Sequence, residues 1–180
     1  MSHESFWDFS LRVYRLPQMS QTCLTLQNVH GFDVNVLLFA CWFARRHGQM
    51  PAPLLHEVLQ FSTQWSGAVV TPLRRARTWM KAELAQTHSL VARQPEAEDL
   101  RERIKAVELR AEKLQQQALE SLAQEYLAAH ARSGPQAAGQ PGTGEAIAHN
   151  LQSLSEASAV TLTPALAALL QILQKNATSD

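Results

Sequence analysis

The sequence predicts an all-α protein: a compact bundle of about five short helices, one long heptad-patterned helix and a flexible C-terminal tail. Apolar residues recur at helical spacing, and no segment shows the alternation of apolar and polar residues that is typical of a β-strand. Eleven of the twelve aromatic residues lie in the first 79 residues, so we expect the dense core to form in the N-terminal half.

The first two helices are indicated by a capping pattern and by proline and glycine. Ser5 and Asp8 have the spacing of a capping box, which predicts a helix from Phe6 to about Leu16. Pro17 can occupy the first turn of a second helix, and Gly31 is expected to end that helix.

The third helix is expected over residues 34–47, with Asp33 as its N-cap and Gly48 directly after it. It is apolar on nearly every side, which is typical of a helix at the centre of a bundle. A fourth helix then opens at Pro51 and Pro53.

We expect the fourth helix to close at Ser66-Gly67 and a fifth to begin at Thr71-Pro72, a cap residue followed by proline. From residue 96 to about 131 the chain contains neither proline nor glycine, and apolar residues repeat with a heptad period. The members of this heptad seam are Leu100, Ile104, Val107, Ala111, Leu114 and Ala118.

At ~1.5 Å per residue this helix would be about 54 Å long. The long helix can project as an arm or pack back on the short helices that precede it.

The predicted organisation is a helical domain over residues 1–131, comprising a head at 5–90 and the long helix at 96–131. A glycine- and proline-rich linker at 132–145 and a weakly helical tail at 146–180 follow, and we expect the tail to be dispensable for folding.

The 180 residues are 46% hydrophobic and 18% charged, which indicates a folded chain of ordinary domain size. Residues 1–81 contain eight Lys/Arg and four Asp/Glu, a net charge of +4, and residues 82–180 contain eight and twelve, a net charge of −4. These halves can attract each other or serve different partners.

Cys23 and Cys41 lie in apolar runs and lack the spacing of a metal site, so we predict no metal, no cofactor and no catalytic thiol. The longest apolar run, residues 36–44, is too short to cross a bilayer. The start of the chain does not resemble a signal peptide, so we expect a cytoplasmic protein without membrane contact.

One candidate binding site is a small polar site for a ligand at the turn before the third helix. Its residues are Trp7, Gln27, Asp33, Asn35 and Trp42. The competing interpretation is structural, because Asp and Asn favour helix starts and tryptophans anchor cores.

A second candidate is a basic face on the fifth helix that holds an anionic partner such as RNA. Its residues are Arg74, Arg75, Arg77, Trp79 and Lys81. The competing interpretation is a solvated face whose long side chains cover the core.

The N-terminal segment resembles an uncharacterised proteobacterial family, the domain of unknown function DUF2390. The residues that carry the resemblance are Phe6-Trp7, Tyr14, Pro17, Cys23-Leu24, Leu26-Gln27, Gly31, Asp33-Val34-Asn35, Leu37-Leu38-Phe39 and Trp42. The resemblance covers roughly residues 5–85, with a looser continuation to about 130. It implies a small, soluble, helical bacterial protein without an assigned activity.

No set of residues with the spacing of a catalytic site is apparent, so the first hypothesis is a non-enzymatic adaptor. Its long helix would bind a protein partner or a second copy of the chain. The second hypothesis is an accessory protein that binds RNA or another anionic partner through the basic face, and the third is a small-ligand site near Asp33.

Overall fold

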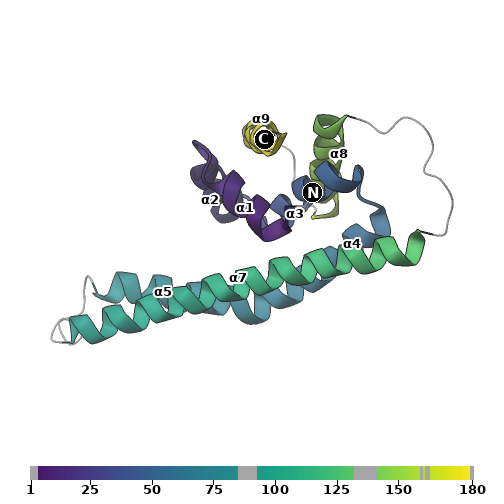
Figure 1. The fold of residues 1–180 in the computed structure, drawn as a ribbon. Helices are drawn as coiled ribbons and strands as arrows, with labels where there is room; N and C mark the ends of the chain where they lie inside the picture. Colours follow the sequence, from purple (N-terminus) through teal and green to yellow (C-terminus); the bar gives the residue numbers. More distant parts are fainter. Residues whose placement is uncertain (1–3, 85–92, 132–141, 159, 161–162, 179–180) are drawn as a thin grey trace. The chain divides into compact units, whose positions relative to one another are not determined.

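The computed structural model describes residues 4–84, 93–131, 142–158, 160 and 163–178 (Figure 1). Those residues form helices and contain no β-strand, which confirms the predicted all-α class. The chain forms two compact units. The core unit comprises residues 1–59 and 116–180, and the hairpin unit comprises residues 60–115.

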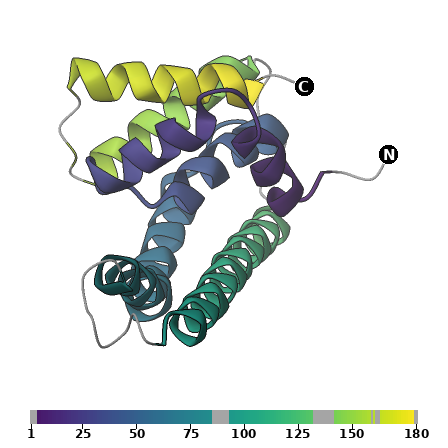
Figure 2. The ribbon, with the colours of Figure 1, turned by 90° about the vertical axis from the view of Figure 1, so that its left-hand side faces the viewer.

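The described residues of the core unit form five complete helices and parts of two others. The complete helices are α1 (Phe6–Tyr14), α2 (Met19–Asn28), α3 (Val34–His47), α8 (Thr143–Ala157) and α9 (Pro164–Thr178). The first part of α4 (Ala52–Trp65) and the second part of α7 (Gln94–His130) complete it. Figure 2 shows α9, in yellow, lying along the purple helix α2, and the green helix α8 packs on α3 and α9.

Helix α3 occupies the centre of the core unit, as its sequence predicts. Its residues from Asn35 to Ala44 are all buried. The ring of Phe39 lies 5.4 Å from that of Phe6 on α1 and 5.7 Å from that of Trp42, measured between centroids. This aromatic cluster fixes α1 on α3.

The predicted N-caps of α1 and α3 are confirmed. Ser5 Oγ accepts a hydrogen bond from the Asp8 amide at 3.1 Å, and Asp33 Oδ1 accepts one from the Asn35 amide at 2.9 Å. The start of α2 differs from the prediction, because Pro17 precedes the helix and Gln18 at its N-cap takes a left-handed φ of 67°.

The prediction of a loosely attached C-terminal tail is wrong, because α8 and α9 are packed helices of the core unit. Helix α8 packs on α3, and α9 packs on α2 and α8. Their buried apolar residues are Ala146, Ile147, Leu151, Leu154, Leu166, Leu170, Leu173 and Ala177. The physical reason is that α3 is apolar all round and needs cover on every side, which these helices help to supply. Of the predicted linker, residues 132–141 lie outside the described ranges, and residues 143–145 belong to α8.

The predicted break at Ser66-Gly67 is also wrong. A π-helical turn, η1 (Ser66–Val70), joins α4 directly to α5 (Thr71–Leu84), and the Thr71 amide donates to the Ser66 carbonyl. Pro72 lacks an amide hydrogen and its ring would crowd the carbonyl four residues earlier. A widened turn just before it relieves that conflict and lets the helix continue.

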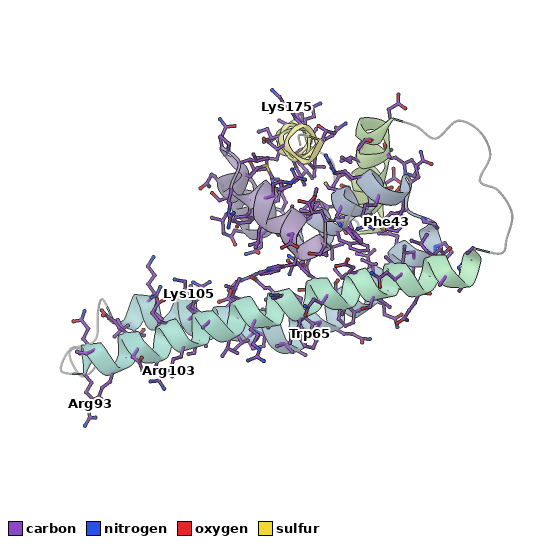
Figure 3. All side chains as sticks on the ribbon, viewed as in Figure 1. Phe43, Trp65, Arg93, Arg103, Lys105 and Lys175 are labelled. Atoms are coloured by element: carbon purple, nitrogen blue, oxygen red, sulfur yellow. The ribbon has the colours of Figure 1, made fainter. Side chains whose placement is uncertain are left out.

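In the hairpin unit, the end of α4, η1 and α5 run antiparallel to the first part of α7 (Figure 1). Trp65 of α4 donates from Nε1 to the Ala111 carbonyl of α7 at 3.1 Å (Figure 3). Its ring also stacks on that of Phe61, 6.1 Å away between centroids. These contacts attach one face of α7 to the helix opposite.

Candidate interaction surface on the long helix

The inner face of α7 in the hairpin unit is marked by the buried residues Glu108, Ala111 and Gln115. Their spacing of three and four residues places them along one side of the helix. A buried glutamate on such a face needs a charged partner.

Two arginines of α5 supply that partner. Arg74 Nε lies 3.0 Å from one carboxylate oxygen of Glu108, and Arg77 donates from Nε to the other. A second guanidinium nitrogen of Arg74 lies 2.6 Å from Glu112. This ion-pair cluster fixes α5 against α7, because a shift along either helix would separate the charges.

The ion-pair cluster also shifts the pKa values of Glu108 and Arg77. Burial pushes the pKa of Glu108 upwards, but hydrogen bonds and positive charge from Arg77 and Arg74 outweigh burial and leave the pKa below its ordinary value. The hydrogen bond to Glu108 raises the pKa of Arg77. Both groups therefore remain charged across the neutral range.

Acidification should weaken the hairpin unit through Glu108. Since its folded-state pKa is depressed, the stabilisation is complete above the unfolded value of about 4.3 and is lost as the pH falls through the folded value. A Glu108→Gln variant should have a lower unfolding free energy at neutral pH by about 1–3 kcal/mol and should lack this acid-dependent loss. Urea unfolding followed by circular dichroism at several pH values measures both effects.

Glu98→Gln is the matched control, because Glu98 is exposed on the same helix and accepts only a local hydrogen bond from Gln94 at 2.8 Å among the contacts described. It should unfold like the parent. Equal stability of the Glu108 and Glu98 variants would mean that the cluster does not hold the hairpin together.

Beside this inner face, α7 carries an open column, which we define as Leu100, Val107 and Leu114. These three residues are 51%, 52% and 49% exposed, respectively. They are one of the two columns of the predicted heptad seam, whereas in the other column Ile104 is half-buried and Ala111 is buried. The hairpin thus covers one side of the seam and leaves the other in solvent.

Arginines flank the open column. Arg103 and Arg110 each follow a column residue by three positions, so they lie beside it on the helix surface. Arg103 forms an exposed ion pair with Asp99 at 2.8 Å, and Arg110 has no ion-pair partner among the residues that the structure describes. Figure 3 shows Arg103 and Lys105 projecting from opposite sides of α7.

The predicted basic face of α5 is divided between two roles. Arg74 and Arg77 belong to the ion-pair cluster with α7, whereas Arg75, Trp79 and Lys81 are exposed. The Trp79 residue is 61% exposed.

A hollow of about 570 Å³ adjoins Trp79. The described residues that line this hollow all belong to α5 and are Thr71, Arg74, Arg75, Thr78, Trp79 and Ala82. The hollow is therefore an open strip of helix surface rather than an enclosed site.

In the predicted polar site, Asp33 and Asn35 make structural contacts. Asp33 caps α3, and the buried Asn35 accepts at Oδ1 a hydrogen bond of 2.8 Å from Gln116 Nε2 of α7. That bond connects the start of α3 with the second part of α7 inside the core unit.

The other three residues of this predicted site have different surroundings. Trp42 is buried in the aromatic cluster, and its Nε1 donates to the Glu4 carbonyl at 3.3 Å. Gln27 donates to the side chain of Asn28 at 3.3 Å, and Trp7 is half-buried on α1. The structure therefore gives Trp42 a packing role and Gln27 a local contact.

Both thiols are buried. Burial raises the pKa of Cys23 to about 12 and also raises that of Cys41, so neither thiol forms a thiolate at neutral pH. Within the described ranges, no group of three His, Cys, Asp or Glu side chains is arranged to hold a metal ion. None of the helices described there is long and apolar enough to cross a membrane.

Comparison with known families agrees with the resemblance seen in the sequence. A family model described as "Protein of unknown function (DUF2390)" matches residues 5–119. The match includes the whole open column and the ion-pair cluster. Searches of curated proteins and of solved structures returned no match.

Proposed function

We propose that this chain, which belongs to the DUF2390 family, is a cytoplasmic, non-enzymatic interaction protein that binds a helix of another protein along α7. The observation that carries the proposal is the open column, three aliphatic residues at seven-residue intervals, each about half exposed. An apolar column of this period is the surface that a second helix packs against in a coiled coil.

The spacing suits a partner helix. Seven residues advance an α-helix by about 10.5 Å, so the three side chains offer evenly separated contacts over roughly 21 Å. The adjoining face of α7, which bears Glu108 and Ala111, is attached by Trp65 and by the Glu108 cluster. The column is thus presented on a preorganised helix, which lowers the entropic cost of binding.

The anionic-partner hypothesis has less support, because two of its four cations, Arg74 and Arg77, already neutralise carboxylates of α7. Arg75 and Lys81 remain exposed beside Trp79, which is a small positive surface for a nucleic-acid site. A partner that uses α7 accounts for more of the exposed apolar surface.

Leu114→Glu should abolish binding of a native partner. Complete burial of a leucine contributes about 1.5–3 kcal/mol, and Leu114 is already half-buried in the free chain. Its loss alone should therefore weaken binding by roughly three- to tenfold, and a glutamate in the interface weakens it much further. The measurement is a pull-down of the tagged full chain from cells of its native host, in which the co-purified partners are quantified by mass spectrometry.

Leu109→Glu provides a matched control, because Leu109 is 54% exposed on the opposite face of the same helix. Partners should be retained by this variant as well as by the parent. Both variants should keep the parental melting temperature, since each site is about half in solvent. A partner lost equally from both variants, or from neither, would contradict binding along the open column.

A further inference from the structure

We infer that the occupant of the open column is an acidic amphipathic helix, an inference that rests on the proposed function. The charges around the column point to this chemistry. Residues 60–115 contain ten Lys/Arg and seven Asp/Glu, a net charge of +3. The ion-pair cluster uses two residues of each sign, so the excess lies on the remaining surface of the hairpin unit.

Arg103 and Arg110 place part of that excess at the edge of the column. The pair of Arg103 with Asp99 is exposed, and such pairs contribute little to stability, so a carboxylate of the partner can replace Asp99 at small cost. Arg110 offers a guanidinium that no described carboxylate pairs with. A partner helix with acidic residues beside its apolar stripe would form ion pairs with both arginines.

A second copy of the chain fits this surface poorly. In an antiparallel pair, the rows of Arg103 and Arg110 would face each other, and like charges repel. In a parallel pair, each arginine would face the residue five positions further on in the other copy, which is Glu108 or Gln115. Both are buried within their own unit, so neither offers a ready partner.

A nucleic acid also fits poorly, because binding of single strands depends on stacking of bases against aromatic rings. The open column is aliphatic, and the exposed Trp79 belongs to α5 rather than to the column. The surface therefore favours the side chains of a protein helix.

The test uses two fluorescein-labelled peptides of three heptads with leucine at the core positions. One carries glutamate at the flanking positions and the other carries lysine. Fluorescence anisotropy with the full chain should show the glutamate peptide binding at least about tenfold more tightly, with a difference that shrinks at high salt. The Arg103→Glu/Arg110→Glu variant should reverse the preference, and Leu114→Glu should bind neither peptide.

The remaining outcomes distinguish failure of the acidic-partner inference from failure of the helix-binding function. Equal binding of both peptides, lost in Leu114→Glu, would overturn the acidic partner and leave the helix-binding function standing. Binding of neither peptide would overturn both. Dimerisation in light scattering that Leu114→Glu removes would identify a second copy as the occupant. Displacement of the glutamate peptide by a uridine oligonucleotide would assign the surface to nucleic acid. Either result overturns the inference.

Discussion

A chain that ends at residue 131 is expected to lose the cooperative unfolding of its core unit. Removal of α8 and α9 takes away five buried leucines and Ile147, and it leaves part of α3 without cover. Because α3 is buried along ten consecutive residues, its apolar side chains would then face water. The exposed surface should cause aggregation or a molten, non-cooperative state.

Differential scanning calorimetry of the truncated chain measures this directly. Addition of a separate peptide spanning residues 142–180 should restore a transition, since it returns the missing helices. A truncated chain that melts within a few degrees of the parent would show that α8 and α9 are not part of the core.

Asn150→Leu should lower the unfolding free energy of the core unit by roughly 3–4 kcal/mol. Asn150 is buried on α8, accepts from the Met50 amide at 2.8 Å, and donates to the carbonyls of Ala40 and Gly48, each at 3.2 Å. Leucine has a similar size but leaves a buried amide and two carbonyls without these bonds, at about 1–3 kcal/mol for the unsatisfied donor alone.

The melting temperature should fall by about 10 °C in a domain of this size. His149→Ala is the control, because His149 is the exposed neighbour on the same helix, and its variant should melt with the parent. A stable Asn150→Leu protein would mean that α8 is held by apolar contact alone.

Local sequence signals predicted the helices of the N-terminal half well. Ser5 and Asp33 act as caps because their side chains satisfy amides in the first turn, which is a property of a few adjacent residues. The central position of α3 also follows from its own composition. The π-helical turn could not be predicted from the local sequence, because the effect of Pro72 depends on whether the helix before it continues.

The role of the C-terminal helices was not predictable in the same way. Leucines at helical spacing indicate an apolar stripe but not the surface that it covers, and α3 lies about a hundred residues earlier in the chain. One signal was present and was missed. Asn150 interrupts the apolar stripe of Ile147, Leu151 and Leu154, and a polar residue at such a position often bonds to buried backbone.

The candidate surface was predicted in part. The heptad period identified the seam of α7, but only the fold shows that one of its columns stays exposed. That outcome depends on the ion pairs of Glu108 with Arg74 and Arg77, which lie 34 and 31 residues away in the sequence. Those pairs also remove two arginines from the basic face, which spacing along α5 alone does not reveal.

Site-specific photo-crosslinking in living cells tests the helix-binding function most directly. Val107 in the open column and Leu109 on the opposite face would each be replaced by p-benzoylphenylalanine in the full chain, since the two sites are 52% and 54% exposed. The proposed function predicts a discrete crosslinked partner from position 107 and none from position 109, with the crosslink mapping to a helical segment of the partner. Identical crosslinking patterns from both positions would contradict it.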